Sequence, residues 1–205
     1  SEAEGIFTVS CAGGNTTACI LPITRAPFAG TAFLITVGGL TGGHSGAEIH
    51  KGRANSNQLM GRVLRALAQK TPMCIQRVDG GLKDNAIPVE TRAVVVVSDS
   101  QVAQQVAQDM EHILQNEYHT TDPALFVKAE AMEPAGLPLD PSSTAKVICM
   151  LQCLPNGIEA MSAEIHGLVQ TSLNMGILVT REDTVQASYS VRSSVDPQKQ
   201  MPKEL

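Results

Sequence analysis

The chain has few aromatic residues: its 205 residues include no tryptophan, two tyrosines and four phenylalanines. We therefore expect a core of aliphatic side chains, which are among the residues most often buried. No apolar stretch approaches the roughly 20 residues that a membrane-spanning helix needs. Lysine and arginine are scattered and the net charge is −5, so the chain lacks the basic run typical of nucleic-acid-binding proteins. These absences argue against a membrane or a nucleic acid as a partner.

Disulfide and metal-binding patterns are also sparse. The five cysteines are odd in number and include no Cys-x-x-Cys pair, which argues against a secreted disulfide framework and predicts a cytoplasmic protein with reduced thiols. Cys149 and Cys153 would share a helix face, a spacing that suits metal or redox chemistry. Their apolar neighbours favour buried structural thiols instead, since a free cysteine behaves as a small hydrophobic residue. The His-Glu-x-x-His motif is absent, and we predict no metal site within this chain.

Apolar spacing along the chain predicts an α+β fold with a mostly antiparallel sheet. Helices are expected where a capping residue precedes an apolar pattern of period 3.6, as at Asp140-Pro141. The expected helices cover residues 56–69, 99–116 and 140–154. The expected strands cover residues 31–40, 73–78, 87–97, 125–132, 168–180 and 184–193, with a hairpin of 6–11 against 18–24 before them.

The order of these elements predicts two ferredoxin-like units in tandem. Residues 31–133 read β-α-β-β-α-β, the split βαβ arrangement. Residues 125–205 repeat the pattern without its last strand, if the strand 125–132 is counted in both units. The helices are expected on one face of a continuous sheet, as a two-layer sandwich. No Ser/Gly-rich linker separates the units, so we predict one domain over 1–205, and the start of a further helix close to the end of the chain suggests a segment of a larger protein.

A histidine flanked by glycines is the first candidate for function. Gly42-Gly43-His44-Ser45-Gly46 lies between a predicted strand and a predicted helix. Glycine there permits positive φ and close approach of another group, and an imidazole on such a loop is able to donate a hydrogen bond outward. The motif is not the G-x-S-x-G elbow of serine hydrolases, and no Lys-Ser/Thr pair follows as in a phosphate-binding loop.

A polar sheet face ending in Arg192 is the second candidate. The predicted strand 184–193 alternates apolar and polar residues, and its neighbour 168–180 carries polar residues with the same period. Antiparallel sheets often have one solvated face, so spacing alone favours an ordinary surface over a substrate-binding patch.

Several stretches taken together resemble the lid domain of the carnosinase-like dinuclear zinc metallopeptidases. The sequence from Gly42 to Asn55 resembles the signature of that lid. Residues 84–88 (DNAIP) resemble its Asn-x-Ile-Pro element, and residues 189–194 (YSVRSS) resemble the strand that carries its substrate-binding arginine. Residues 167–176 (GLVQTSLNMG) are similar to the aminoacyl-histidine dipeptidase branch. Residues 1–14 resemble the segment that follows the last metal-ligand aspartate, so 1–30 would be a hairpin entering from a catalytic domain outside this chain.

The resemblance implies the lid and dimerisation domain of a cytosolic dipeptidase that cleaves Xaa-His dipeptides and forms a homodimer. Two zinc ions would be bound outside this segment, which would be inactive alone. His44 would reach the partner subunit's active site as an oxyanion donor, and Arg192 would hold the substrate carboxylate. Asn85 is either an added substrate contact or a turn residue, while Thr171 and Ser172 are further candidates for the carboxylate.

Two alternatives remain at this point. One is a dipeptidase or tripeptidase of the same family with broader specificity. The other is a non-catalytic ferredoxin-like module that binds a small molecule or mediates assembly, because a shared fold does not establish a shared function. Under either peptidase reading, Arg53 and Asn55 would fix the loop and cap the helix that follows.

Overall fold

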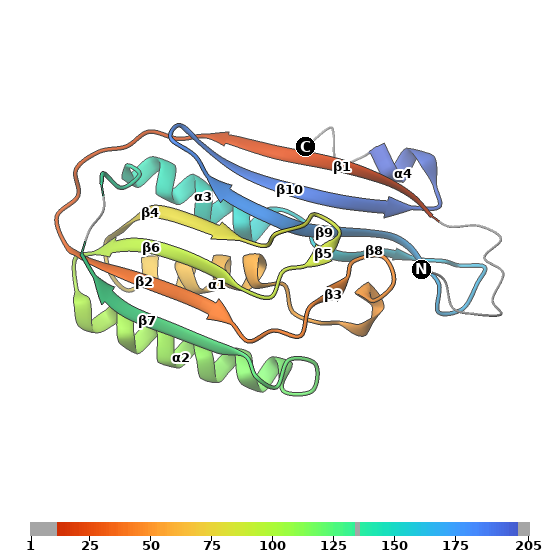
Figure 1. The fold of residues 1–205 in the computed structure, drawn as a ribbon, viewed down its shortest axis with the longest axis horizontal. Helices are drawn as coiled ribbons and strands as arrows, with labels where there is room; N and C mark the ends of the chain where they lie inside the picture. The colour runs from red at the N-terminus through yellow and green to blue at the C-terminus, as the bar shows by residue number, and fades with distance from the viewer. Residues whose placement is uncertain (1–11, 134–135, 201–205) are drawn as a thin grey trace.

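The computed structural model describes residues 12–133 and 136–200, which form an eight-stranded antiparallel sheet covered by helices (Figure 1). Its strands are β1 Gly13–Pro22, β2 Thr31–Gly38, β4 Met73–Gly80, β6 Thr91–Val97, β7 Phe126–Met132, β8 Gly157–Met161, β9 Val169–Thr180 and β10 Thr184–Ser193. The strand order is β1-β10-β9-β4-β6-β2-β7, with β8 beside β9. The predicted mixed fold with a large antiparallel sheet is confirmed.

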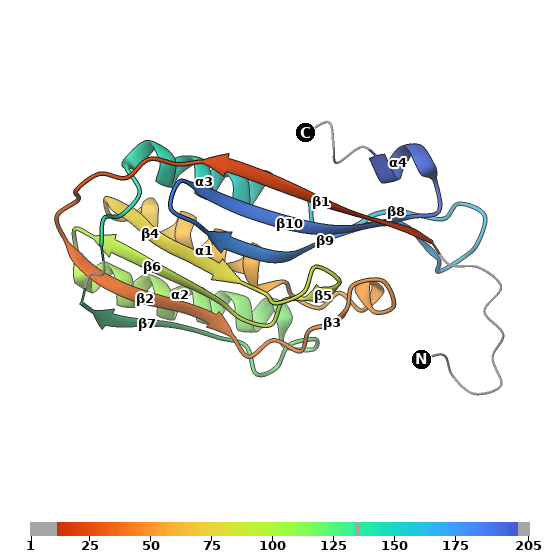
Figure 2. The same ribbon diagram turned by 45° about the horizontal axis from the view of Figure 1, so that its top comes forward.

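Three helices cover one side of the sheet, as two views show (Figures 1 and 2). They are α1 Ser56–Ala68, α2 Ser100–Tyr118 and α3 Pro141–Cys153. Each begins after a side chain that accepts a backbone N–H of the first turn: Asn55, Asp99 and Asp140. These caps satisfy donors that the start of a helix leaves unpaired. A short helix, α4 Asp196–Gln200, follows β10.

The core between the sheet and the helices is aliphatic, as the scarcity of aromatic residues predicted. Leu59, Leu64 and Leu67 of α1 are at most 1% exposed. Ile75 and Val95 face them from β4 and β6, both fully buried. Burial of these side chains removes apolar surface from water and holds the two layers together.

The first ferredoxin-like unit is confirmed by the sheet topology. It consists of β2, α1, β4, β6, α2 and β7, and its strands lie in the order β4-β6-β2-β7. The strand predicted over 87–97 is divided in two. Ala86–Ile87 form β5, which pairs with β3 Gly43–His44 in a separate two-stranded sheet, and β6 begins at Thr91. Pro88 lies at the break, where its missing N–H cannot continue a ladder.

The first strand of the second unit was predicted wrongly. The strand predicted over 125–132 is β7, which pairs with β2 at the opposite edge from β9 and β10. The first strand of the second unit is instead β1, which pairs with β10 along its length, from Gly13 opposite Ser193 to Pro22 opposite Thr184. The second unit is therefore β1, α3, β9, β10 and α4, with the whole first unit inserted between β1 and α3. Residues 6–11, the predicted hairpin partner of 18–24, lie outside the described residues.

The two units meet where β4 runs beside β9. Gly80 is opposite Leu178, the one residue pair of this ladder in the described ranges. Thr180 adds hydrogen bonds next to this pair: its N–H donates to Asp79 Oδ1 at 2.7 Å, its Oγ1 accepts the Val78 N–H at 2.8 Å, and the same hydroxyl donates to the Val78 carbonyl at 2.8 Å. We call this line the seam. At the seam, hydrogen bonds of the Thr180 side chain stand where backbone hydrogen bonds between β4 and β9 would otherwise be expected.

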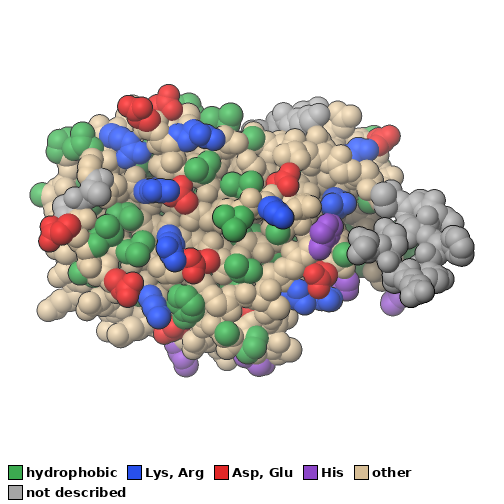
Figure 3. Space-filling model, viewed as in Figure 1, with side chains coloured by type: hydrophobic (Ala, Val, Ile, Leu, Met, Phe, Trp, Pro, Cys, Tyr) green, Lys and Arg blue, Asp and Glu red, His purple; other side chains and the backbone are tan. Residues whose placement is uncertain are grey.

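The sheet face opposite the helices mixes positive, negative and apolar side chains (Figure 3). On the part of this face that is described, charges of the two signs are interspersed. No helix among the described residues has the length and apolar character to cross a bilayer.

Candidate functional site

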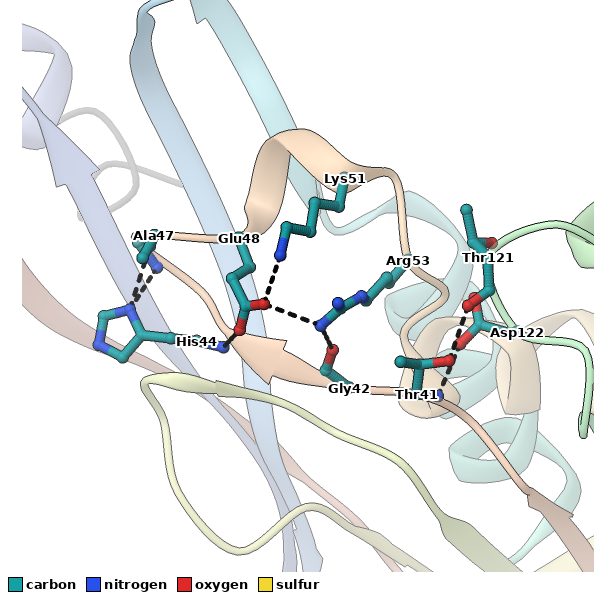
Figure 4. Close-up of polar contacts among 10 residues, drawn as sticks. Thr41, Gly42, His44, Ala47, Glu48, Lys51, Arg53, Thr121 and Asp122 are labelled. Atoms are coloured by element: carbon teal, nitrogen blue, oxygen red, sulfur yellow. Dashed lines mark hydrogen bonds and ion pairs between the residues drawn. The ribbon is translucent and has the colours of Figure 1, made fainter.

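The segment between β2 and α1 carries His44, and one buried carboxylate holds both of its ends; Figure 4 shows the end at Thr41. Asp122, which follows α2 and is 1% exposed, accepts the N–H of Thr41 at 2.8 Å through Oδ1. Its Oδ2 accepts the N–H of Ala54 at 2.9 Å. Residues 41–54, which we call the His44 loop, are thereby closed at their base by a residue about 70 positions further along the chain.

Glu48 organises the middle of the loop. Its Oε2 accepts the His44 N–H at 2.9 Å, and its Oε1 accepts Lys51 Nζ at 2.8 Å and Arg53 Nη1 at 3.2 Å. The bond from Lys51, followed by that from the His44 backbone, lowers the pKa of Glu48 to about 2. Arg53 also donates to the Gly42 carbonyl. Glu48 is therefore ionised at neutral pH, and the prediction that Arg53 fixes the loop is confirmed.

Two glycines are required for this fold of the loop. Gly42 and Gly43 have φ of 65° and 140°, values that side-chain-bearing residues rarely adopt. A Cβ on Gly43 would lie 2.5 Å from Arg53 Nη1 and 2.6 Å from Glu48 Oε2. A Cβ on Gly42 would lie 2.4 Å from a methyl carbon of Val89. The Gly-Gly pair thus lets the backbone pass close to the groups that hold it.

The His44 ring is exposed and fixed in one tautomer. Its Nδ1 accepts the backbone N–H groups of Gly46 and Ala47, each at 3.1 Å. An Nδ1 that accepts hydrogen bonds carries no proton, so the proton of the neutral imidazole lies on Nε2. The ring points away from Glu48 and Lys51 (Figure 4). The loop therefore presents an N–H donor outward.

Arg192 of β10 lies directly against this loop. A Cβ on Gly46 would be 2.7 Å from Arg192 Nε and 2.9 Å from its Cζ. The Nε atom is buried and has no hydrogen-bond partner within the described ranges, although guanidinium N–H groups ordinarily find acceptors when buried. The fold thus brings together a loop of the first unit and an arginine of the second.

The other three predicted residues lie at different positions around this pair. Ser172 is opposite Arg192 in the ladder and shares its sheet face, 4% exposed. Asn85 is exposed, and its carbonyl accepts the Ser45 N–H at 3.0 Å, so its backbone supports the loop. Thr171 is one residue from Ser172 and therefore faces the other side of the sheet.

Thr171 has partners on that other side. Its Oγ1 lies 2.9 Å from Ser193 Oγ and also donates to Gln198 of α4. Strand alternation, together with these contacts, separates Thr171 from Arg192. The structure brings His44, Arg192, Asn85 and Ser172 to one side of the sheet and Thr171 to the other.

A buried asparagine network below the loop was not anticipated from the sequence. Asn55, the predicted cap of α1, also donates through Nδ2 to Asn174 Oδ1 at 3.3 Å and to the Met175 carbonyl at 3.2 Å. Asn174 Nδ2 donates to the carbonyls of Asp84 and Ala86, each at 2.8 Å. The network ties α1, β9 and the 84–86 segment together, and so connects the two units beneath the site.

The groups gathered here are suited to an oxygen-rich ligand. They are an imidazole N–H, a guanidinium and amide groups, which donate hydrogen bonds to carbonyl or carboxylate oxygens. Within 12–133 and 136–200, no three histidine, cysteine, aspartate or glutamate side chains gather as a metal site would require. The described residues therefore do not fit the two zinc ions that the family resemblance implies, and no zinc ligand is assigned to them.

Comparison with known proteins agrees with this arrangement. Residues 35–122 match the family described as peptidase dimerisation domain. The chain is 32% identical over 200 residues to the cytosol non-specific dipeptidase of Escherichia coli (strain K12), covering 96% of this chain and 41% of that protein. Residues 35–122 of the chain thus belong to the peptidase dimerisation-domain family. The family match includes the His44 loop, Asn85 and Asp122, and the lid-domain resemblance is confirmed.

A solved structure supports the assignment over nearly the whole chain. The crystal structure of aminoacylhistidine dipeptidase from Vibrio alginolyticus superposes with a TM-score of 0.91 at 30% identity, covering 95% of this chain and 40% of that one. The chain thus spans about two fifths of the length of the relatives that it matches. The agreement extends to both units, since the superposition is not confined to residues 35–122.

Proposed function

We propose that this chain is the lid and dimerisation domain of a zinc-dependent dipeptidase that hydrolyses Xaa-His dipeptides. The observation that supports the proposal is that Gly46 borders both groups: its Cα faces the Arg192 guanidinium, and its N–H donates to His44 Nδ1. Support for the substrate comes from the name of the Vibrio alginolyticus relative, aminoacylhistidine dipeptidase. The zinc ions would be bound outside this segment and would polarise the scissile carbonyl.

His44 would stabilise the negative oxygen that develops on the attacked carbonyl. Its Nε2–H is free to donate outward because Nδ1 is occupied by two backbone N–H groups. A preorganised donor of this kind contributes about 3–4 kcal/mol to transition-state stabilisation. Glu48 would act as a positioning residue, since it accepts the backbone N–H of His44 and makes no bond to the ring.

Arg192 would bind the C-terminal carboxylate of the dipeptide. A guanidinium matches a carboxylate through two parallel hydrogen bonds, which a lysine cannot reproduce. Ser172 lies beside Arg192 on the same face, and the exposed Asn85 side chain would approach the substrate from the loop side. Thr171 has no part in this proposal because it faces the opposite side of the sheet.

A broader dipeptidase is the second candidate, and one comparison favours it. The Escherichia coli relative is named a non-specific dipeptidase. The two candidates are separated by kcat/KM of the full-length enzyme for an Xaa-His dipeptide and for matched dipeptides with another second residue. A preference of tenfold or more for histidine is expected. Equal values would replace the Xaa-His proposal with the broader one.

The parent enzyme is proposed to be a cytosolic homodimer in which His44 serves the partner subunit. A cytosolic location follows the name of the Escherichia coli relative, and self-association follows the family. A heterodimer that pairs a His44→Ala subunit with a subunit disabled at its zinc site tests the arrangement. About half of the wild-type activity is expected, because one composite site stays intact.

The reciprocal heterodimer is the control. It places both defects in one subunit beside a wild-type partner, and it should be nearly inactive if His44 acts across the interface. Should this heterodimer keep half of the activity while the first one loses it, His44 acts within its own subunit. That result would overturn the trans arrangement but not the family assignment.

A further inference from the structure

Residues 84–86 of the first unit lie across β9 of the second unit, and one buried asparagine holds them there. Asn174 of β9 is 1% exposed, and its Nδ2 donates to the carbonyls of Asp84 and Ala86, each at 2.8 Å. These two residues stand on either side of Asn85. One amide group of the second unit therefore holds the backbone that carries Asn85, a candidate substrate contact of the first unit.

The same three residues also hold the His44 loop. Ala86 is opposite His44 in the ladder between β3 and β5. The Asn85 carbonyl accepts the Ser45 N–H at 3.0 Å. Both contacts are made by backbone atoms of the loop, so a displacement of residues 84–86 would move the imidazole without removing it.

Backbone packing leaves residues 84–86 little room to move on β9. A Cβ on Gly176, two residues after Asn174, would overlap the Asp84 carbonyl oxygen. A Cβ on Gly81 would likewise overlap the Gly176 carbonyl oxygen. On the side of β1, the Asp84 carboxylate accepts the Thr16 hydroxyl at 2.9 Å. The second unit therefore holds this segment through both its backbone and a side chain.

The strand that carries Asn174 also borders Arg192. Arg192 is opposite Ser172, which lies two residues before Asn174 on β9. One strand thus supports the guanidinium and holds the segment that supports the imidazole. We propose that Asn174 is a positioning residue: it sets the imidazole and Asn85 relative to the guanidinium of Arg192. This assignment rests on the proposed function, in which these groups bind one dipeptide.

The buried network reaches α3 through Asn156, which follows the helix, and not through the cysteines of its last turn. Asn156 Oδ1 accepts Asn55 Nδ2 at 3.0 Å. Cys149 and Cys153 are both exposed, so the prediction that they are buried structural residues is wrong; the stripe that α3 buries excludes both positions. Of the three asparagines in this network, Asn174 is the one that donates to residues 84–86.

Steady-state kinetics of the full-length enzyme on its best dipeptide substrate test the assignment. In Asn174→Ala, kcat should fall about tenfold or more, since a misplacement of about 1 Å by a distant change can cost about 10²-fold. KM should rise by a smaller factor, because Arg192 keeps its place on β10.

Asn57→Ala is the matched control. Asn57 of α1 is also fully buried, and its Nδ2 donates to the Met175 carbonyl of β9 at 3.0 Å. Its hydrogen bonds within the described residues do not include residues 84–86. This variant loses a comparable buried contact between α1 and β9, so it should be destabilised while kcat and KM stay at their wild-type values.

Coupling to His44 separates positioning from a general loss of stability. If Asn174 acts through His44, most of the effect of Asn174→Ala on kcat should disappear in a His44→Ala background. Gly176→Ala provides a second route to the same displacement, because its Cβ would push against the Asp84 carbonyl. This variant keeps the Asn174 amide and should show the same fall in kcat and the same coupling.

Amide hydrogen exchange of the same full-length proteins gives a readout that does not depend on activity. Protection of the Ser45 N–H should fall in Asn174→Ala and Gly176→Ala and stay unchanged in Asn57→Ala. Wild-type protection and wild-type kcat in the first two variants, or losses of kcat that add to that of His44→Ala, would overturn the positioning role. A wild-type enzyme that cleaved no dipeptide would instead overturn the proposed function, and the exchange data would still test how residues 84–86 are held.

Discussion

Removal of the Asp122 carboxylate should loosen the His44 loop more than any other single change in its base. The carboxylate accepts two backbone N–H groups, from Thr41 and Ala54, and is 1% exposed. In Asp122→Ala, the N–H of the buried Ala54 is left without an acceptor, which costs about 1–3 kcal/mol. The exposed Thr41 N–H can bind water instead, so the loss of its hydrogen bond to Asp122 costs less free energy.

Working from these terms, we expect Asp122→Ala to lower the free energy of unfolding by about 3 kcal/mol. Asp122→Asn keeps one acceptor oxygen, but its amide NH₂ then faces the second N–H, so roughly half of that loss should remain. Asp99→Ala is the matched control, because Asp99 also accepts one backbone N–H, at the start of α2. The control should lose about 1 kcal/mol, as exposed helix caps do.

Urea unfolding gives the free energies, and amide hydrogen exchange locates the change. Protection should fall over residues 41–54 in both Asp122 variants and stay unchanged there in Asp99→Ala. A loss below about 1 kcal/mol for Asp122→Ala, or equal exchange over the loop in variant and wild type, would refute the view that one carboxylate closes the loop.

Further changes test the middle of the loop and its neighbour. Glu48 has a pKa lowered from 4.5 to about 2, so its contribution to stability is present above pH 4.5 and lost as pH falls toward 2. The melting temperatures of Glu48→Gln and wild type should therefore converge as the pH falls through that range. Plots of melting temperature against pH that stay parallel for the two proteins would contradict this. In the full-length enzyme, His44→Ala should lower kcat about 10²–10³-fold with little change in KM. Arg192→Ala should raise KM, because the carboxylate contact is made both in the bound substrate and in the transition state. If steady-state kinetics showed the opposite pattern, His44 would be the substrate-binding residue and Arg192 the one that acts in the transition state. Gly46→Ala should displace the Arg192 side chain and raise KM, while Gly14→Ala, whose Cβ would meet Val191 O at 3.9 Å, should leave KM unchanged.

Local patterns in the sequence predicted most of the elements correctly. Asn55 and Asp140 mark the starts of α1 and α3, and the side chain of each accepts an N–H in the first turn of its helix. The alternation in 184–193 is also confirmed, with Val185 and Val191 fully buried on the core side. Capping and alternation depend on neighbours along the chain, which is why they can be read without a structure.

Pairings between distant segments could not be predicted in the same way. The strand of 125–132 has an alternation that fits either unit, and the choice of β1 as the partner of β10 depends on contacts across more than 160 residues. Asp122 gave no signal because one aspartate after a helix resembles many surface residues. The separation of Thr171 from Ser172 also required the register, since a shift of one residue exchanges the two faces of a strand.

The seam between the two units has a mechanical consequence for the site. His44 is carried by the first unit and Arg192 by the second, so neither unit alone fixes the distance between them. Along β4 and β9 the described residues contribute one ladder pair and the bonds of Thr180, and the Asn55–Asn174 network adds a connection at the end nearest the site; a small rotation about this line would have to strain that network. Such a rotation would change the gap between imidazole and guanidinium while every other strand pairing stays intact. A dipeptide bound to both groups would then link the two units of the sheet. The angle between the units would in turn determine which substrate lengths can reach both groups.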